Sequence, residues 1–210
     1  MLTAGPTYEQ IDPVRFIGNF SSGKMGFSIA EELANQGAQV VLISGPTSLQ
    51  IENSNIKRID VISAQEMYVA AQEQFPSCDG GIMTAAVADF TPLHIDKKKV
   101  KRGKENYSVE LTPTKDIAAS LGKLKRENQF LVGFALETND EELNAKGKLE
   151  KKNLDFIVLN SLNDKGAGFQ HNTNKITIFS KYGECKKFAL KSKAEVAVDI
   201  VNELIAYYEE

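Results

Sequence analysis

Cysteine and histidine are scarce in this 210-residue chain, which has two of each. Cys78 and Cys185 stand alone, with no Cys-x-x-Cys pair and no histidine close to either in the sequence. This argues against a disulfide framework or a zinc site and fits a reducing cytoplasm. Because His94 and His171 are the only histidines, a Ser-His or Cys-His nucleophile has few candidate partners. We expect both histidines to lie in surface loops.

Long apolar runs are also missing. None approaches the roughly 18 residues that a membrane span needs, and the first residues lack the basic and apolar regions of a signal peptide. The formal charge of −3 argues against nucleic-acid binding through the whole surface. The hydrophobic share of 42% and the charged share of 25% are typical of a globular protein. Without an internal repeat, low-complexity tract or clear linker, residues 1–210 are predicted to form a single domain.

Short hydrophobic runs alternate with helical patterns along most of the chain. The run Gln39–Ser44 is mostly apolar and rich in β-branched residues, as in a strand buried on both faces of a parallel sheet. The repeated βαβ order predicts an α/β fold with a doubly wound, mostly parallel sheet and helices on both faces. Strands are expected at Met1–Thr7, Gln39–Ser44, Arg58–Val61, Gly80–Ala86, Phe130–Phe134 and Phe156–Leu159. Helices are expected at Phe27–Ala34 with a stop at Gly37, and at Ala64–Gln74, Asp116–Lys125 and Asp140–Lys152.

The C-terminal region departs from this alternation. Lys175–Ser180 and Lys187–Leu190 are predicted to pair antiparallel across the Tyr182-Gly183 turn. A closing helix is expected from Ala194 to Tyr208. The sequence therefore predicts a small antiparallel extension near the C-terminus.

One stretch, Asp12–Gly26, concentrates groups that bind anions. It holds a cation, an amide, two hydroxyls, a second cation and three glycines, and a helical pattern follows directly. A Gly/Ser segment that opens a helix presents free backbone N–H groups and the positive end of the helix dipole, and phosphate commonly binds there. A surface turn with a capping serine would have the same spacing, but such a turn needs neither Arg15 nor Asn19. The stretch therefore predicts a phosphate site.

Ligands of open α/β sheets bind outside the carboxyl ends of the strands. Asp89 ends one strand at this edge, where it either caps a turn or accepts hydrogen bonds from a nucleotide. Lys148 and Lys152 are four residues apart and share one helix face, where plain solubilising charge is the alternative role. The segments expected to meet at this edge are Ser21–Gly26, Ala85–Phe90, the loop before Asp116, and Gly133–Thr138.

Two familiar phosphate-binding loops fit the sequence poorly. A dinucleotide dehydrogenase of this fold needs a G-x-G-x-x-G turn after strand one and an acid at the end of strand two. Here the second strand ends in Ser44-Gly45-Pro46-Thr47, and Gly23 with Gly26 supplies half of the glycine pattern. The P-loop is absent because Gly23-Lys24 is followed by Met25.

Six cations lie within the eight residues Lys97–Lys104 of this acidic protein. A charge run is usually a solvated face, but this one follows the presumed site strand by about ten residues. That is the length of a flap that could close lysines over bound phosphates, neutralise developing charge and exclude water. Nucleic acid is a competing partner, although no aromatic residues are interleaved with these cations. An NAD(P)-dependent oxidoreductase and a non-enzymatic nucleotide- or nucleic-acid-binding protein remain the alternatives.

Five motifs can be compared with a known family. They are Asp12-Pro13-Val14-Arg15-Phe16-Ile17-x-Asn19-x-Ser21-Ser22-Gly23-Lys24-Met25-Gly26, Ala85-Ala86-Val87-Ala88-Asp89-Phe90, Lys99-x-Lys101, Gly133-Phe134-x-x-Glu137-Thr138 and Lys152-Asn153-x-Asp155. Together they resemble phosphopantothenate–cysteine ligase, also called phosphopantothenoylcysteine synthetase, over essentially the whole chain. The resemblance implies a Rossmann-like, homodimeric enzyme, present either as a stand-alone form or as an excised ligase domain.

The implied reaction joins 4′-phosphopantothenate to L-cysteine in coenzyme A biosynthesis. Ala88 resembles the bacterial form, which implies CTP as co-substrate, an acyl-cytidylate intermediate, and CMP and pyrophosphate as products. Mg²⁺ is expected, held mainly by the triphosphate rather than by a protein metal site. Where relatives often have Asn-Pro-Asp-Ile, this chain has Thr114-Lys115-Asp116-Ile117. The side-chain contacts of that asparagine are therefore not expected here, whereas backbone contacts would survive. A separate phosphopantothenoylcysteine decarboxylase is an expected partner, and neither nucleic acid nor membrane is.

The resemblance also implies roles for individual residues. Asn19, Lys99 and Arg15 are the implied catalytic residues, with Asn19 acting on the acyl-nucleotide intermediate and its reaction with cysteine. Arg15, Asn19, Ala86 and Lys101 are implied to bind the substrate. The implied nucleotide-binding residues are Ser21, Ser22, Gly23, Lys24, Met25, Gly26, Met83, Thr84, Ala85, Asp89, Lys99, Thr114, Lys115, Asp116, Ile117, Phe134, Lys148 and Lys152.

Overall fold

A computed structural model describes residues 1–103, 105–137, 139–161 and 171–209 of the chain. Within these residues, eight strands form one mixed sheet. Six neighbouring strands, from β10 (Phe156–Ser161) in the interior to β5 (Ile56–Asp60) at one edge, run parallel to one another. The last two strands, β12 and β13, add antiparallel at the other edge. The strand order is β13 (Cys185–Lys187), β12 (Ile176–Ser180), β10 (Phe156–Ser161), β9 (Phe130–Glu137), β6 (Gly80–Met83), β1 (Leu2–Ala4), β4 (Val40–Ser44) and β5 (Ile56–Asp60).

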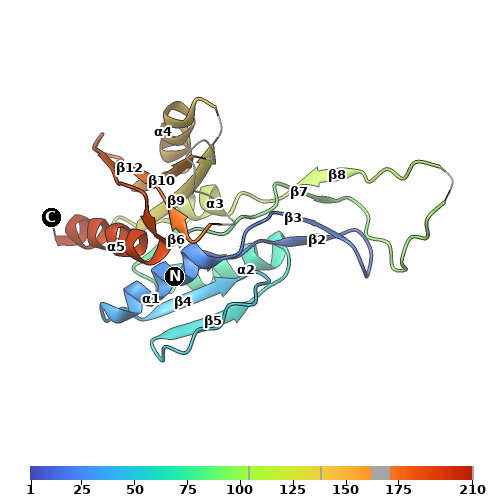
Figure 1. The fold of residues 1–210 in the computed structure, drawn as a ribbon, viewed down its shortest axis with the longest axis horizontal. Helices are drawn as coiled ribbons and strands as arrows, with labels where there is room; N and C mark the ends of the chain where they lie inside the picture. The colour runs from blue at the N-terminus through green and yellow to red at the C-terminus, as the bar shows by residue number, and fades with distance from the viewer. Residues whose placement is uncertain (104, 138, 162–170, 210) are drawn as a thin grey trace.

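Helices cover both faces of this sheet, and Figure 1 shows the layers. On one face, α1 (Lys24–Asn35) and α5 (Lys193–Glu209) bury a core that includes Ile29 and Ile200. On the other face, α2 (Ala64–Gln74), α3 (Ile117–Leu124) and α4 (Glu141–Lys151) bury a second core, and a short 3₁₀ turn, η1 (Phe75–Ser77), follows α2. The predicted doubly wound, Rossmann-like fold with an antiparallel extension is therefore confirmed. Among the described residues, no helix combines the length and apolar character needed to cross a membrane.

Two hairpins leave the sheet together and form what we call the arm (residues 7–20, 89–103 and 105–114). The first pairs β2 (Tyr8–Gln10) with β3 (Phe16–Gly18), and the second pairs β7 (Phe90–Pro92) with β8 (Leu111–Pro113). Both extend away from the helices in the same direction (Figure 1), with β2 packed beside β7. The sequence predicted Asp12–Gly26 as one loop, whereas the structure divides it between the arm and the start of α1.

The base of the arm is anchored to α2. Glu9 is only 3% exposed, and its Oε1 accepts a hydrogen bond from the backbone N–H of Ala64 at 2.8 Å, in the first turn of that helix. Tyr8 N–H donates to the carbonyl of Ile62 at 2.8 Å, and the Tyr8 ring stacks on Phe16 with centroids 3.8 Å apart. A carboxylate at a helix N-terminus is favourably placed. The arm therefore has a fixed direction where it leaves the sheet.

Several element boundaries differ from those predicted. The strand predicted at Gly80–Ala86 ends at Met83 because the chain then turns toward the arm, and Ala86 forms an isolated bridge to Pro6. The strand predicted at Lys187–Leu190 is instead β13 (Cys185–Lys187), because Phe179 pairs with Cys185 across the turn at 181–184. The structure adds a short pair that the sequence did not predict, β11 (Thr173–Asn174) with β14 (Lys191–Ser192).

A buried carboxylate links the sheet to α3 and α5. Asp155 is 1% exposed, and its oxygens accept hydrogen bonds from Lys125 Nζ at 2.8 Å, Lys181 Nζ at 2.7 Å and Tyr207 Oη at 3.0 Å. The backbone N–H of Leu131 donates to it as well, at 2.7 Å. Burial alone would raise the pKa of Asp155, but the two lysines and this N–H outweigh it and hold the pKa below its ordinary value.

The Asp155→Asn substitution is expected to lower the free energy of unfolding by about 3 kcal/mol at pH 7, because it leaves two lysines facing an amide. Urea unfolding at 25 °C measures this. The pKa in the folded chain lies below the unfolded value, so the contribution is complete above about pH 4 and declines as pH falls further. The difference between variant and parent should therefore shrink in acid.

Asp60→Asn is the matched control, because it removes the same charge from an exposed pair with Arg58. Its effect should stay below about 1 kcal/mol. Equal losses for the two variants would contradict the structural role assigned to Asp155.

Candidate functional site

A cavity of about 590 Å³ opens at the carboxyl ends of β1, β6 and β9. The start of α1, the turn after β6, the loop before α3 and the C-terminal part of α4 all reach its wall. This is the edge at which ligands of open α/β sheets bind. The site predicted from the sequence and this cavity therefore lie at the same place.

Most of the residues implied to bind nucleotide lie together on the cavity wall. Lys99 is the exception. Asn19 and Ala86, which are implied to bind the substrate, also lie on the wall. Thr138, from the Gly133–Thr138 motif, and Lys104, from the lysine-rich run, fall outside the described residues. The predicted residues that line the cavity are Asn19, Ser21, Ser22, Gly23, Lys24, Met25, Gly26, Met83, Thr84, Ala85, Ala86, Asp89, Thr114, Lys115, Asp116, Ile117, Phe134, Lys148 and Lys152.

The first turn of α1 forms one wall of the cavity. Gly23 is the N-cap residue with φ 79°, a left-handed conformation that favours glycine, and its N–H donates to Ser21 Oγ at 3.3 Å. Gly26 packs so closely on the strands that a Cβ there would lie 2.4 Å from Thr84 Oγ1 and 2.6 Å from Ala4 Cβ. No acidic side chain lies in this first turn. The backbone N–H groups and the helix dipole are thus available to an anion.

Two lysines of the cavity already have carboxylate partners. Lys148 Nζ lies 2.5 Å from Glu137 Oε1, and Lys152 Nζ lies 3.0 Å from Asp116 Oδ2. Asp116 is also the N-cap of α3, accepting from the N–H of Ala119 at 2.9 Å. Burial opposes ionisation of Asp116, but the N–H of Ala119 and Lys152 outweigh it and lower the pKa. Both cations are therefore held at the wall before any ligand arrives.

The turn that carries Lys152 is fixed against α3. Asn153 has φ 52°, and its Nδ2 donates to the carbonyl of Gly122 at 2.8 Å. A Cβ on Gly122 would lie 2.0 Å from the Lys152 carbonyl oxygen, so only glycine allows this approach. Lys152 is thereby positioned through its backbone as well as through Asp116.

The base of the second hairpin brings two predicted segments together. Thr114 donates from its N–H to the Asp89 carbonyl at 2.9 Å and from Oγ1 to the Ala88 carbonyl at 2.7 Å. Lys115 Nζ lies 4.5 Å from the centre of the Tyr68 ring, which turns that side chain toward α2. The loop that departs from the family's usual sequence is therefore tied by threonine to the chain next to Asp89.

Three residues that the sequence analysis did not identify also line the cavity. Lys193, at the start of α5, is 7% exposed, and burial together with the nearby Lys24 lowers its pKa. Asn174 is 1% exposed, and Asn160 has a buried Oδ1 with no hydrogen-bond partner among the described residues. Asn160 is the next-to-last residue of β10, so the rule that ligands bind at the carboxyl ends of strands could have identified it. The sequence does not identify Lys193 as a cavity residue, because it reaches the cavity through the packing of α5 beside α1.

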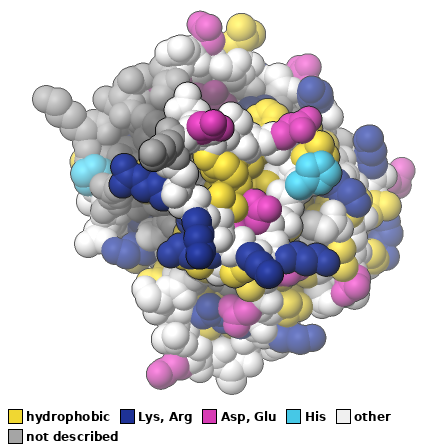
Figure 2. Space-filling view, turned by 90° about the vertical axis from the view of Figure 1, so that its right-hand side faces the viewer, with side chains coloured by type: hydrophobic (Ala, Val, Ile, Leu, Met, Phe, Trp, Pro, Cys, Tyr) yellow, Lys and Arg dark blue, Asp and Glu magenta, His cyan; other side chains and the backbone are white. Residues whose placement is uncertain are grey.

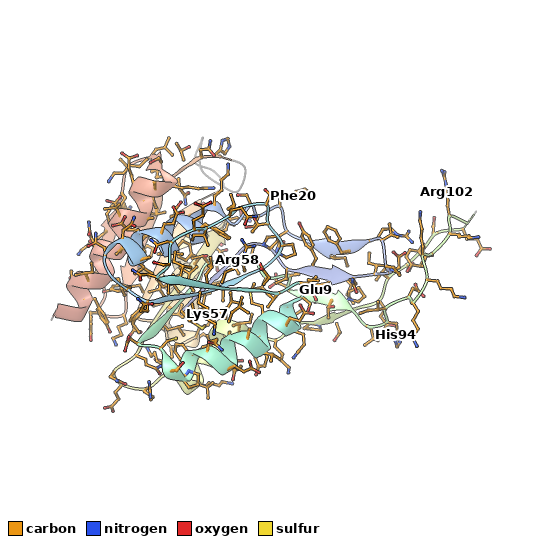
Figure 3. All side chains as sticks on the ribbon, turned by 90° about the horizontal axis from the view of Figure 1, so that it is seen from below. Glu9, Phe20, Lys57, Arg58, His94 and Arg102 are labelled. Atoms are coloured by element: carbon orange, nitrogen blue, oxygen red, sulfur yellow. The ribbon has the colours of Figure 1, made fainter. Side chains whose placement is uncertain are left out.

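The predicted catalytic residues are divided between the cavity and the arm. Asn19 lies at the cavity, and its Nδ2 donates to the carbonyls of Ala86 at 3.0 Å and Val87 at 3.2 Å. Arg15, Lys99 and Lys101 are not among the residues that line the cavity. Arg102, two residues after Val100, lies at the far end of the arm (Figure 3). The structure therefore separates the lysine run from the phosphate-binding wall of the same chain.

The far side of the arm is both cationic and apolar. Viewed from this side, a row of Lys and Arg side chains crosses the face, with hydrophobic side chains beside it (Figure 2). Large hydrophobic residues are exposed along the arm: Val14, Phe16, Phe20, Phe90, Leu93, Ile95, Tyr107 and Leu111. Phe20, labelled where the arm joins the body in Figure 3, is the most exposed at 85%.

The fold and this site define a Rossmann-like α/β protein with a cavity at the carboxyl edge of its sheet, lined by a helix N-terminus and by lysines. The family model described as DNA/pantothenate metabolism flavoprotein C-terminal domain matches residues 1–208. The chain belongs to this family.

Known proteins with similar sequences are about twice as long as this chain. It is 56% identical over 204 residues to a "Cysteine/Cysteine sulfinic acid decarboxylase" from an unknown prokaryotic organism, covering 97% of this chain and 57% of that protein. It is 47% identical over 208 residues to the "Coenzyme A biosynthesis bifunctional protein CoaBC" of Haemophilus influenzae, covering 99% of this chain and 51% of that protein. The chain thus spans about half the length of the curated relatives it matches.

A solved structure covers nearly all of the chain. It is the crystal structure of the C-terminal domain of a coenzyme A biosynthesis bifunctional protein CoaBC, with a TM-score of 0.84 and 40% identity. The match includes 99% of this chain and 94% of that one. The similarity therefore extends over the sheet, its helices and the arm together.

Gly26→Ala is expected to weaken anion binding at the start of α1, because the added methyl forces the helix away from Thr84 and Ala4. The free energy of unfolding should fall by about 1–3 kcal/mol. Isothermal titration with inorganic pyrophosphate and urea unfolding measure the two effects.

Gly147→Ala is the control, because a Cβ at this exposed position of α4 meets nothing within 4 Å. It should raise stability by up to about 1 kcal/mol and leave pyrophosphate affinity unchanged. If Gly26→Ala binds pyrophosphate as tightly as the parent, the anion site is not at the start of α1.

Proposed function

We propose that this chain is a phosphopantothenate–cysteine ligase that uses CTP. The observation that carries the proposal is the cavity, in which helix N–H groups and the lysines Lys24, Lys148 and Lys152 converge. Membership of a pantothenate-metabolism family and the coenzyme A biosynthesis names of its relatives support this substrate class. The reaction would take place in the cytoplasm, as the scarcity of cysteine suggests.

The chemistry follows from the poor reactivity of a carboxylate toward an amine. An oxygen of the 4′-phosphopantothenate carboxylate attacks the α-phosphorus of CTP, and the bond to pyrophosphate breaks. The amine of L-cysteine then attacks the acyl carbon, CMP leaves with the bridging oxygen, and the amine loses a proton. Three anionic groups must approach one another, so fixed N–H dipoles and cations are the groups that lower this barrier.

Asn19 is placed to act at the second step. Its amide is held at the cavity by the carbonyls of Ala86 and Val87, beside the loop that begins α1. We propose that it orients the acyl group for attack by cysteine. No covalent nucleophile is required of the protein, which suits a chain with two cysteines and two histidines.

Lys99 needs a second copy of the chain or a movement of the arm to reach a cavity. We propose the former: two copies pair through the exposed apolar side chains of the arm, and each arm presents Lys99 and Lys101 to the other copy's cavity. Eight large hydrophobic residues exposed along two hairpins favour such a partner. A homodimer of this kind would also give each site its second set of cations.

Mg²⁺ is expected to accompany the triphosphate. Among the described residues, no three His, Cys, Asp or Glu side chains gather at one point. Asp89 and Asp116 line the cavity, and each could supply one ligand to an ion that is held mainly by phosphate oxygens. When bound, such an ion offsets the charge of the phosphates.

Multiple-turnover release of pyrophosphate that requires CTP, 4′-phosphopantothenate and L-cysteine together is the direct test of this function. Assays with ATP replacing CTP and with NADPH address the nucleotide preference and the oxidoreductase alternative. Carbon dioxide release from cysteine is measured as well, because one relative carries a decarboxylase name. Pyrophosphate release that does not depend on phosphopantothenate would reject the proposal, as would hydride transfer or decarboxylation alone.

Lys99→Gln should slow pyrophosphate release from CTP at least about tenfold, a loss of about 1.4 kcal/mol of transition-state stabilisation. Single-turnover kinetics at saturating CTP measure this. Mixing Lys99→Gln with Lys152→Gln should restore about a quarter of the parent rate, since half of randomly paired dimers contain one intact site of two. An unchanged rate for Lys99→Gln removes this lysine from the mechanism, and a mixture that gains nothing shows that the arm does not serve a second copy.

Asn19→Ala should form the acyl-cytidylate but transfer it slowly to cysteine, at least about tenfold below the parent rate. Single-turnover pyrophosphate release reports the first step, and CMP release in the presence of cysteine reports the second. Equal impairment of both steps would argue against the role proposed for Asn19.

A further inference from the structure

One carboxylate holds the two hairpins of the arm together. Asp12 lies in the turn between β2 and β3 and is 1% exposed, although the arm extends away from the core. Its Oδ1 accepts from the N–H groups of Val14 at 2.8 Å and Arg15 at 2.9 Å, which closes the turn locally. Its Oδ2 accepts from Arg15 Nε at 3.0 Å, from Arg15 Nη2, and from the N–H of Val100 at 3.1 Å. Oδ1 therefore closes the turn between β2 and β3, whereas Oδ2 connects this turn to Val100 in the second hairpin.

Val100 is held through both of its backbone polar groups. Its N–H donates to Asp12, and its carbonyl accepts from Arg15 Nη2 at 2.7 Å, across 85 residues of sequence. A neighbouring contact supports this register, because the N–H of Asp96 donates to the Ile11 carbonyl at 3.0 Å. Val100 lies between Lys99 and Lys101, so a clamp on its peptide groups fixes where both lysine side chains begin.

The clamp stays charged at neutral pH. The hydrogen bonds from Arg15 hold the pKa of Asp12 well below its usual range, although burial opposes this, and the N–H groups of Val14 and Val100 add to the effect. Asp12 correspondingly raises the pKa of the Arg15 guanidinium. The charges of Asp12 and Arg15 thus offset each other close to Lys99 and Lys101. Arg15 Nε and Nη2 are both engaged in hydrogen bonds of the clamp.

We propose that Asp12 is a positioning residue: through the backbone of Val100 it sets the place from which Lys99 and Lys101 reach the phosphates. The effect on rate rests on the proposed ligase function, whereas the effect on the arm does not. In this account Arg15 serves the same clamp.

Asp12→Asn isolates this role. The amide keeps Oδ1 for the turn but replaces Oδ2 with an N–H₂ group, which faces the donors of Arg15 and Val100. Glu110→Gln is the matched control, since it removes one negative charge from an exposed position on the arm. Two quantities are measured on the full chain: amide hydrogen exchange at Val100, and pyrophosphate release at saturating substrates.

Asp12→Asn should speed exchange at Val100 and slow pyrophosphate release by about tenfold to a hundredfold, as expected when a catalytic cation is displaced. Glu110→Gln should change neither. In a background that carries both Lys99→Gln and Lys101→Gln, Asp12→Asn should cost no more than about a further twofold, because the lysine contacts that Asp12 positions are already absent. This non-additivity distinguishes positioning from a general loss of stability.

Three results would overturn the proposal. If Asp12→Asn leaves the rate of amide hydrogen exchange at Val100 unchanged, no clamp exists. If that variant releases pyrophosphate at the parent rate, the clamp does not affect catalysis. If the rate losses from Asp12→Asn and from the two lysine substitutions multiply fully in the combined variant, Asp12 acts independently of Lys99 and Lys101. If the parent chain releases no pyrophosphate, the ligase function and the catalytic role of Asp12 are both rejected. Faster exchange at Val100 in Asp12→Asn would in that case still support the clamp itself.

Discussion

The close approach of α1 to the ends of β1 and β6 is the constraint on which the site depends. Gly26 lies so near Ala4 and Thr84 that no side chain fits, and Gly23 takes a left-handed conformation at the N-cap. These two glycines let the first turn of the helix face the carboxyl edge of the sheet at short range. Because helix N–H groups attract anions over only a few ångströms, this approach determines where a phosphate can bind.

The charges of the cavity are organised around that turn. Lys148 and Lys152 are held by Glu137 and Asp116, so their positions are defined without a ligand, and an incoming phosphate would have to exchange with those carboxylates. Such pairing keeps lysines in place at little cost in stability, because each carboxylate offsets the cation. The cations on the arm are organised differently, since Asp12 and Arg15 fix the backbone of Val100 and leave the lysine side chains to extend from it.

Much of the layered fold follows from local sequence patterns. The helix predicted at Ala64–Gln74 has those bounds in the structure, where Ser63 and Glu66 form a capping box at its start. The apolar strand Gln39–Ser44 lies inside the sheet, as its composition indicates. The loop Ser21–Gly26 could be recognised because glycine and serine before a helix have a physical meaning at those positions.

The arm could not be predicted in the same way. Its strands β2 and β3 have three residues each, too few for an alternating pattern, and the turn between them is held by contacts with Val100 far along the chain. Lys193 reaches the cavity only because α5 packs beside α1, a tertiary contact that its own sequence does not indicate. Local patterns therefore predicted the elements and the phosphate loop, whereas long-range packing decided where the lysine run lies.

The central claim is that the cavity brings a carboxylate into contact with the α-phosphate of a nucleotide. Transfer of ¹⁸O from carboxyl-labelled 4′-phosphopantothenate, followed by mass spectrometry of the products, tests it most directly. The account predicts one labelled oxygen in each CMP and none in pyrophosphate. Unlabelled CMP, or label in a phosphate released from the far end of the nucleotide, would contradict it.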